Sequence, residues 1–448
     1  MERWSHLNAT EIRALADDCV HCGFCLPACP TYLLWGREAD SPRGRIYLMK
    51  ARLEGRADLS GSFEQHIDAC LGCMACVTAC PSGVRYDRLI EYTRPEVERT
   101  VKRSSGERLY RRLLFALFPY PSRLRPLAAA LRIAQRSGIQ RLLRSMGCTR
   151  LLSPRLAALE RLAPPPSARA DREPIPPVVP AIGASRQRVG MLLGCVQRVF
   201  FPGVNHATAR VLSHEGCDVV VPPEQGCCGA LMLHAGQIED ARACARRLID
   251  VFERAGLDST ARAGAARIAS LDRIVINAAG CGSAMKEYGT LLADDPAYAE
   301  RARAFASRCV DISELLAELP AQATRHPLNV RVIYQDACHL NHAQGVKQAP
   351  RTVLRSIPEL TLQEIAEADT CCGSAGVYNL LQPDAASDLR DRKVGNVLRA
   401  ECDLLVSSNP GCLLQIASGL EAAGRRIPTA HVVEVIDASI RGESSWRL

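Results

Sequence analysis

Two cysteine runs near the N-terminus constrain the fold of this chain more than any other feature. Each follows the pattern Cys-x2-Cys-x2-Cys-x3-Cys-Pro, and together they comprise Cys19, Cys22, Cys25, Cys29, Cys70, Cys73, Cys76 and Cys80. This is the spacing of proteins that hold two 4Fe–4S clusters. Three thiolates two residues apart surround one cubane within a loop, and the fourth faces the other cluster. The proline after each run prevents a helix from continuing there.

The crossed pattern predicts which cysteines share a cluster. One set is Cys19, Cys22, Cys25 and Cys80, and the other is Cys70, Cys73, Cys76 and Cys29. Zinc is the alternative, but zinc sites favour two separated Cys-x2-Cys pairs. Helices predicted over Arg43–Leu53 and Tyr86–Arg99 favour a helical ferredoxin over a compact βαβ ferredoxin. The arginines of the Ser41–Arg45 turn lie either near a cluster or in solvent.

The cysteine count indicates a reducing compartment. The 448 residues contain 21 cysteines, an odd number whose spacing does not fit a small secreted scaffold. No run of 18 apolar residues predicts a membrane-spanning helix. Residues 1–18 mix charged and apolar side chains, so we expect no Sec signal peptide. These features predict a cytoplasmic protein.

The net charge of +8 is concentrated in one segment. Between Arg108 and Arg155 there are eleven arginines and no lysine, aspartate or glutamate, which leaves 8 − 11 = −3 for the rest of the chain. Because the positive charge is confined to this one segment, it does not indicate a nucleic-acid binder. Arginines beside leucine and phenylalanine suggest an interfacial helix on an anionic membrane. A partner's acidic surface or a solvated helix are the alternatives, and Pro119, Pro121 and Pro126 interrupt any long helix.

Residues 187–448 contain an internal repeat. An apolar run at Val189–Cys195 precedes Cys227-Cys228-Gly229, and Val330–Cys338 precedes Cys371-Cys372-Gly373 at nearly the same distance. Each half then has a helical stretch, another apolar run, and Gly-Cys at Cys281 or Cys412. Alternating strands and helices predict two α/β halves with largely parallel strands.

Each half thus supplies four cysteines, either as metal ligands or as buried structural thiols. They are Cys195, Cys227, Cys228 and Cys281, then Cys338, Cys371, Cys372 and Cys412. Adjacent cysteines strain a disulfide, which favours ligation of a further cluster or metal. The glycine after each pair would let the backbone approach that group. His339 is either an extra ligand, a proton carrier or a hydrogen-bonded loop residue.

The other cysteines are expected to be core or surface thiols: Cys148, Cys217, Cys244, Cys309 and Cys402. The chain has no GxGxxG, Walker or HExxH motif, and no Ser-His-Asp arrangement. We therefore expect no flavin or nicotinamide site and no oxidation of an organic substrate by this chain alone.

These motifs resemble the iron–sulfur subunit of glycolate oxidase. The resemblance lies in Cys19–Cys25, Cys70–Cys76, Asn277–Cys281 and Ser408–Cys412. It implies that an FAD-containing partner oxidises glycolate to glyoxylate. It also implies that this chain passes the electrons to a membrane acceptor, which we expect to be quinone, on the cytoplasmic face of the inner membrane.

The architecture is also similar to other iron–sulfur proteins, which leaves alternatives open. They are the subunits of lactate and glycerol-3-phosphate dehydrogenases, a heterodisulfide-reductase-like thiol/disulfide oxidoreductase, and a scaffold that only docks partners. In heterodisulfide reductase each repeat ends in Cys-x2-Cys, whereas Ala278 and Asn409 stand at the first of those positions here. That difference argues against disulfide chemistry.

The expected fold is α+β and multidomain. A helical two-cluster ferredoxin domain (1–100) is followed by an arginine-rich connector with a proline-rich linker (101–186). Two repeated α/β Cys-Cys-Gly domains (187–325 and 326–448) complete the chain.

Overall fold

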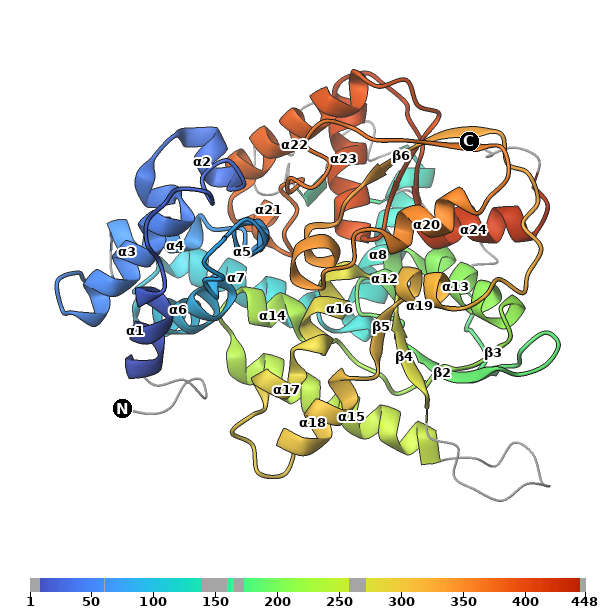
Figure 1. Ribbon diagram of the computed structural model, residues 1–448, viewed down its shortest axis with the longest axis horizontal. Helices are drawn as coiled ribbons and strands as arrows, with labels where there is room; N and C mark the ends of the chain where they lie inside the picture. The colour runs from blue at the N-terminus through green and yellow to red at the C-terminus, as the bar shows by residue number, and fades with distance from the viewer. Residues whose placement is uncertain are drawn as a thin grey trace.

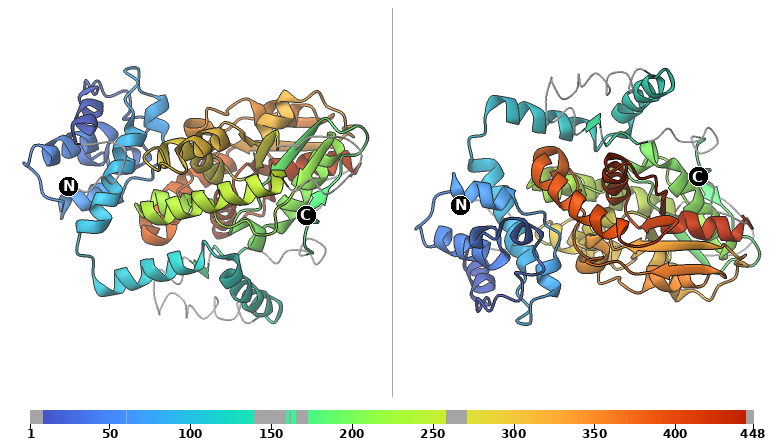
Figure 2. Two further views of the ribbon diagram at one scale, coloured as in Figure 1. Left: turned by 90° about the horizontal axis from the view of Figure 1, so that it is seen from below. Right: turned by 90° about the horizontal axis from the view of Figure 1, so that it is seen from above.

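A helical module and an α/β body make up the molecule, with two connector helices along one side (Figures 1 and 2). The computed structural model describes residues 9–59, 61–138, 159–160, 162–164, 173–257 and 271–443. The predicted fold class is confirmed: a helical ferredoxin-like region precedes two repeated α/β halves built on parallel sheets.

The module is built from short helices around one apolar core. They are α1 (Ala9–Asp17), α2 (Pro30–Trp35), the 3-10 turn η1 (Glu38–Asp40), α3 (Pro42–Leu53), α4 (Ser62–Asp68), α5 (Ala75–Thr78) and α6 (Tyr86–Thr100). Ile46 and Met49 on α3 pack in that core against Leu89 and Ile90 on α6. The helices predicted over Arg43–Leu53 and Tyr86–Arg99 are therefore confirmed as α3 and α6.

The start of α3 depends on a close backbone approach. Ser41 caps the helix by accepting a hydrogen bond of 3.0 Å from the Gly44 amide, and Pro42 occupies the first turn. A Cβ atom on Gly44 would lie 1.9 Å from the carbonyl oxygen of Glu38. Only glycine lets η1 and α3 pack this closely, and that packing sets the path of the chain between the two cysteine runs.

The connector forms two helices, α7 (Ser105–Leu117) and α8 (Pro121–Arg136). Pro119 lies between them and Pro121 begins α8, but the helix continues through Pro126. The expectation that all three prolines interrupt helical structure is therefore wrong for Pro126. Figure 2 shows both helices running along one side of the α/β body.

Buried arginines attach α7 to the helical module. Arg103 and Arg111 are both nearly inaccessible to solvent. They form ion pairs with Glu64, Asp68, Glu98 and Glu107. Because a buried ion needs paired charges, this network fixes the position of α7 against α4 and α6. Arg111 is consequently not available at the surface.

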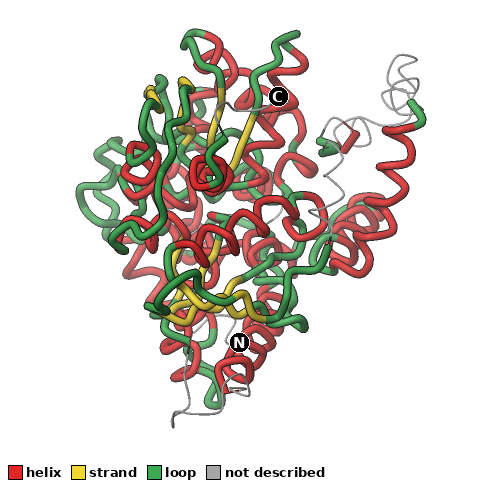
Figure 3. Tube along the Cα trace, turned by 90° about the vertical axis from the view of Figure 1, so that its right-hand side faces the viewer, coloured by secondary structure: helices red, strands yellow, loops and turns green. Residues whose placement is uncertain are grey.

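The α/β body contains two sheets, which Figure 3 shows as two groups of strands surrounded by helices. The first half comprises β1 (Val178–Val179), β2 (Gln187–Met191), α12 (Gln197–Phe200), α13 (Pro202–His214), β3 (Cys217–Val220), α14 (Ala230–His234), α15 (Ile238–Leu257), β4 (Arg273–Ile276), α16 (Ala279–Lys286), α17 (Tyr288–Leu291), α18 (Ala299–Ala306), β5 (Cys309–Asp311) and α19 (Ile312–Glu318). The second comprises β6 (Val330–Gln335), the π-helical turn η3 (His339–Ala343), α20 (Ala349–Arg355), β7 (Leu360–Gln363), α21 (Tyr378–Leu381), α22 (Pro383–Leu398), β8 (Leu404–Ser407), α23 (Pro410–Ala422), β9 (Thr429–His431) and α24 (Val432–Ile440).

The two sheets share one strand order. The first runs β1-β3-β2-β4-β5 and the second β7-β6-β8-β9, with every pair parallel except β1 with β3. Removing β1 makes the orders equivalent, so β2, β3, β4 and β5 correspond to β6, β7, β8 and β9. In such sheets the carboxyl ends of the two central strands form the switch point where ligands bind. Those strands are β2 with β4, and β6 with β8.

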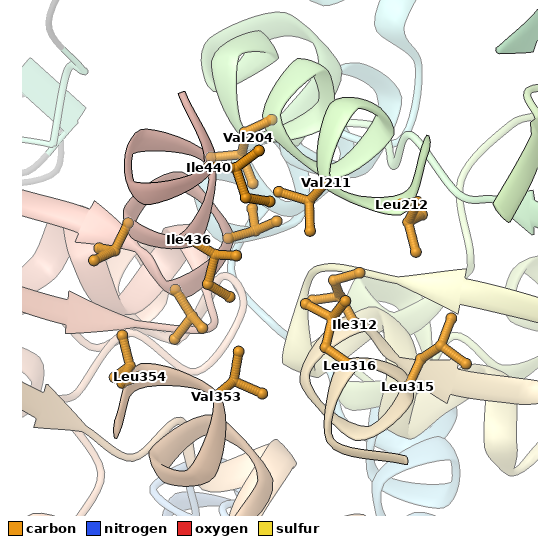
Figure 4. Packing of buried hydrophobic residues seen from close by; sticks show 14 of the residues in the cluster. Val204, Val211, Leu212, Ile312, Leu315, Leu316, Val353, Leu354, Ile436 and Ile440 are labelled. Atoms are coloured by element: carbon orange, nitrogen blue, oxygen red, sulfur yellow. The ribbon is translucent and has the colours of Figure 1, made fainter. Parts of the chain in front are cut away.

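Four helices join the halves through a shared apolar core. α13 packs on α24, and α19 packs on α20. These are equivalent pairs, since α13 and α20 follow the first strand of each half while α19 and α24 follow the last. Figure 4 shows Val211, Leu316, Leu354 and Ile436 from the four helices meeting in this core. The packing relates the halves by a pseudo-two-fold rotation.

Replacing Gly44 with alanine should destabilise the helical module, because the new Cβ collides with the Glu38 carbonyl. Overpacking of this kind costs about 1–3 kcal/mol of unfolding free energy. The midpoint of urea-induced loss of cluster absorbance should fall accordingly. Gly106→Ala is the matched control, since Gly106 also lies in the first turn of a Ser-capped helix but a Cβ atom added there would meet no other atom within 4 Å. Equal midpoints for both variants would contradict the steric account.

Candidate iron–sulfur centres and the cavity between the halves

The first cysteine run and the last cysteine of the second run line one cavity. Cys19, Cys22, Cys25 and Cys80 border a space of about 30 Å³, with Cys76 at its edge. Cys80 therefore faces the first run, as the crossed pattern requires. Cys22 is exposed, so this centre lies at the surface of the module.

The other set is buried. Cys29, Cys70, Cys73 and Cys76 are each almost inaccessible to solvent. Burial raises the pKa of Cys76, and the neighbouring thiolates of Cys73, Cys70 and Cys29 raise it further. Such mutual influence requires the four side chains to lie close together. The second centre is thus internal, whereas the first is accessible.

Hydrogen-bond donors surround both sets. Arg45 is buried, with Nη1 4.0 Å from Cys29 Sγ, and Tyr86 Oη donates to Cys70 Sγ at 3.5 Å. Arg43 Nη1 donates to the His21 carbonyl at 2.9 Å within the first cysteine loop. Both arginines of the Ser41–Arg45 turn therefore lie against the cysteine loops and not in a solvated turn. Positive charge and donors beside thiolates suit an anionic 4Fe–4S cluster, so the residues fit the group.

In the first α/β half, cysteines from three loops converge at the carboxyl ends of the strands. Cys195 follows β2, the Cys227–Cys228 pair follows β3, and Cys281 lies in α16 after β4. Hydrogen bonds with Cys195, Cys228 and Cys244 raise the pKa of Cys227. Those with Cys227 and Cys281 hold the pKa of Cys228 well below its usual range. The four predicted cysteines are thus brought together.

Cys244 also belongs to this group, although sequence reasoning assigned it to core or surface thiols. It lies on α15, and a hydrogen bond with Cys227 lowers its pKa. Its distance along the chain matches no metal motif, which is why spacing did not reveal it. One feature of the sequence could have indicated Cys244. It lies one turn after Ala241, on the apolar face of the helix that became α15.

The second half repeats the arrangement with a histidine in addition. Cys338 Sγ lies 4.0 Å from Cys371 Sγ and 3.5 Å from His339 Nδ1. Hydrogen bonds with Cys371 and Cys412 hold the pKa of Cys372 well below its usual range. Each half therefore contains at least one thiol that favours the thiolate, the form that binds metal.

The glycine after each cysteine pair has a packing role. Gly229 and Gly373 have φ of +81° and +86°. A Cβ atom there would lie 3.0 Å from the carbonyl oxygen of Ala241 or 2.5 Å from that of Ala386. At these glycines the backbone closely approaches α15 and α22. The approach to a bound metal or cluster stays a prediction.

The cysteine groups differ from a preformed site for a single metal ion. Within the described part of the chain, no three histidine, cysteine, aspartate or glutamate side chains converge as ligands of one ion. A 4Fe–4S cluster distributes its thiolates over four irons and so needs them around a larger volume.

The two Cys-Cys-Gly sites open into one cavity between the halves. It has a volume of about 590 Å³ and is lined by all eight predicted cysteines, by Leu127 and Leu131 of α8, and by His234 and His339. The two imidazole rings lie with centroids 4.6 Å apart. A cavity of this size falls in the range of small-molecule sites, about 300–1,000 Å³.

The buried centre of the module abuts the second α/β half. Leu71, Cys73 and Ala75 pack in one apolar cluster with Cys338 and Cys371. The hydroxyl of Tyr378 donates to the Ala69 carbonyl at 3.0 Å, and His342 Nδ1 lies 3.1 Å from Thr78 Oγ1. The loop from Cys70 to Cys76 is thereby held against the second Cys-Cys-Gly site.

Two of the remaining cysteines lie in strands. Cys217 and Cys309 are buried in β3 and β5. Burial raises the pKa of Cys217 to about 11 and that of Cys309 further, so both stay protonated thiols. Cys402 lies in the loop before β8, and Cys148 lies outside the described residues.

Three family models match the chain. They describe a 4Fe-4S dicluster domain at residues 15–84, a linker region of the glycolate oxidase iron-sulfur subunit at 106–163, and a cysteine-rich domain at 189–286 and 332–417. A probable glycolate oxidase iron-sulfur subunit of Bacillus subtilis is 38% identical over 94% of this chain and 93% of its own. The Escherichia coli glycolate oxidase iron-sulfur subunit is 36% identical over 99% of this chain and 98% of its own. This chain belongs to the glycolate oxidase iron–sulfur subunit family.

A more distant relative covers only part of the chain. A lactate utilization protein A of Exiguobacterium is 28% identical over 56% of this chain and 98% of its own length. A hypothetical protein from Helicobacter pylori has the same overall fold, with a TM-score of 0.50 and 9% identity over 89% of this chain and 72% of its own.

Membership of this family establishes what the chain carries. It holds two 4Fe–4S clusters and is the iron–sulfur, electron-transfer subunit of an oxidoreductase complex with other subunits. None of the helices that the structure describes is long and apolar enough to cross a membrane.

Replacing Cys73 with serine should remove the buried cluster and largely spare the accessible one. The two ferredoxin clusters should account for about eight irons in anaerobically purified protein. The variant should lose about half of them, measured by iron analysis and visible absorbance. Cys402→Ser is the control and should keep the full complement. Four additional irons in the wild type would locate a cluster in a Cys-Cys-Gly half, and a colourless zinc-loaded protein would contradict the assignment.

Proposed function

We propose that this chain passes electrons from an FAD-containing subunit, which oxidises glycolate to glyoxylate, to a membrane quinone. One observation carries the proposal: the candidate centres form a continuous series through the molecule. The series begins at exposed Cys22, continues through the buried set that includes Cys73, and reaches Cys338 at the cavity. Bound 4Fe–4S clusters supply one-electron transfer along such a series.

We assign the cluster ligands to the crossed sets. Cys19, Cys22, Cys25 and Cys80 hold the accessible cluster, and Cys70, Cys73, Cys76 and Cys29 hold the buried one. The convergence of each Cys-Cys-Gly group and its low-pKa thiol support a further cluster or metal in each half. The ligands there are Cys195, Cys227, Cys228 and Cys281, and Cys338, Cys371, Cys372 and Cys412, with Cys244 beside the first group.

An exposed apolar patch beside Cys22 supports electron input at the accessible cluster. Val20 is 69% and Phe24 is 65% exposed, and both border the cavity of Cys19, Cys22, Cys25 and Cys80. Large apolar side chains that remain in solvent next to a redox centre are typical of a docking surface. We assign this patch to the FAD-containing subunit. The chain itself has no dinucleotide-binding motif, so it does not oxidise glycolate alone.

The connector supplies a surface for the cytoplasmic face of the inner membrane. On α7 and α8 the exposed arginines lie beside exposed Leu109, Leu113 and Ile133; these arginines are Arg108, Arg112, Arg123, Arg125 and Arg136. Basic residues near an anionic surface contribute about 1 kcal/mol each. Leu127 and Leu131 of α8 line the cavity, so this surface would bring the cavity close to quinone in the membrane.

Lactate is the second candidate substrate of the complex. The similarity to a lactate utilization protein A covers just over half of this chain. Glycolate and lactate are both 2-hydroxy acids, and their oxidation would occur on the partner subunit. Glycolate is favoured because the relatives named for it match nearly the full chain.

Replacing Val20 and Phe24 with serine should slow electron transfer from the FAD-containing subunit. Loss of two central apolar contacts commonly costs more than about 1.4 kcal/mol, so reduction should slow at least about tenfold. The measurement is glycolate-dependent bleaching of cluster absorbance after mixing the two subunits anaerobically. Ile182→Ser is the control, since Ile182 is 52% exposed on the α/β body. Glycolate oxidation by the isolated chain, or an unchanged rate in the double variant, would contradict the proposal.

Changing Arg108, Arg112, Arg123 and Arg125 to glutamine should abolish binding to anionic liposomes in a flotation assay. The wild type should float with the vesicles at low salt and be released at high salt, because screening weakens surface attraction. Arg111 is left unchanged, since it is buried in ion pairs with the module. The control is a variant with Arg254, Arg392, Arg425 and Arg426 changed to glutamine. It loses the same amount of positive charge, but from positions outside α7 and α8. Failure of the wild-type complex to float would end the membrane assignment.

A further inference from the structure

The cavity between the halves has the features of a ligand site as well as of a cluster environment. Apart from its cysteines, its walls are mainly apolar, including Phe118, Leu131, Phe200, Phe201 and Leu380. An apolar wall with a few convergent polar groups is the usual composition of a small-molecule site. The cavity is also larger than the space at the accessible ferredoxin centre, about 590 Å³ against about 30 Å³.

Two buried imidazole nitrogens in this cavity lack partners. Neither His234 Nε2 nor His339 Nε2 has a hydrogen-bond partner among the described residues, and His339 is only 7% exposed. Leaving a buried donor or acceptor unpaired is unfavourable. Both rings line the cavity and lie 4.6 Å apart, so one polar ligand atom could approach both.

The cavity reaches the surface beside the connector. Leu127 of α8 lines it and is 49% exposed. The same helix carries exposed Arg123 and Arg125, part of the surface assigned to the membrane. A ligand leaving an apolar phase would therefore meet an apolar opening first and the histidines deeper inside.

We propose that this cavity binds the ring of the quinone acceptor between the two Cys-Cys-Gly sites, with a ring oxygen hydrogen-bonded to His234 and His339. The inference rests on the proposed function, since it locates the acceptor's site. Reduction of the quinone takes two electrons and two protons and yields the quinol. The electrons come from glycolate through the FAD-containing subunit and this chain's clusters.

The protons have a polar route to the same histidine. His234 also borders a second pocket of about 200 Å³, on the side of the module, whose lining includes Glu91, Glu287 and His342. Charged and titratable side chains in that pocket would give protons a route to His234. Proton supply is therefore separate from the apolar opening at α8, through which the quinone enters and the quinol leaves.

The decisive experiment measures binding of a decyl-substituted benzoquinone to the cluster-loaded chain by equilibrium dialysis. One molecule should bind per chain. His234→Phe, which keeps a ring but removes the hydrogen bond, should weaken binding about tenfold. Leu127→Trp, which narrows the opening, should also weaken it. Ile182→Trp is the control for an added indole at a similarly exposed apolar position outside the cavity. Unchanged iron content and absorbance would show that each variant is intact.

The outcomes separate this inference from the proposed function. Bleaching of the clusters by glycolate and the FAD-containing subunit does not require the cavity. Normal bleaching with no quinone binding, or with equal binding by His234→Phe and the wild type, would overturn the cavity assignment alone. Glutathione disulfide could instead displace the quinone and be reduced to glutathione. That result would assign the cavity to a disulfide substrate and would also overturn its assignment to quinone.

Discussion

The packing of α13 on α24 and of α19 on α20 determines where the chemistry of this molecule lies. These four helices bury one apolar core between two parallel sheets and so relate the halves by a pseudo-two-fold rotation. Each sheet presents cysteines at the carboxyl ends of its central strands, because the chain turns there between strand and helix. The rotation brings the two groups to opposite sides of one cavity. Neither half would enclose that space alone.

The helical module depends on the same body for its orientation. The loop from Cys70 to Cys76 packs directly against Cys338 and Cys371, while Cys22 of the first run is exposed. Arg88 and Glu287 form an ion pair between the module and the first half, and Arg103 and Arg111 hold α7 in place. Electron transfer falls steeply with distance, so this fixed seam between module and body is a functional requirement as much as a structural one.

Sequence reasoning predicted those features that depend on local spacing. Both cysteine runs, α3, α6, the repeated halves and the parallel sheets follow from motifs and periodicity. Spacing could not predict contacts made across the fold. Cys244 was missed because it lies on α15, distant in sequence from Cys227, which it contacts only in the folded chain. Arg111 looked like a surface charge because its carboxylate partners lie on α4 and α6. The cavity was likewise beyond prediction, since it exists only after α8 and both halves have packed together.

The two Cys-Cys-Gly sites are related by symmetry but differ in chemistry. Cys244 lies three residues after Ala241 on the helix that supports Gly229, and Leu389 holds the equivalent place after Ala386 in the second half. The first site therefore has a fifth thiol. The second instead has His339, and buried Lys393, whose pKa is lowered by burial although the thiolates of Cys372 and Cys371 oppose that shift. Cationic side chains lie near both sites, since Arg198 is close to Cys195 and Cys227 of the first site. The second site meets the buried ferredoxin cysteines, whereas the site with the fifth thiol lies across the cavity. Under the proposed function, electrons would reach the second site first, because it lies against the buried ferredoxin cysteines, and the cavity proposed for the acceptor lies between the two sites.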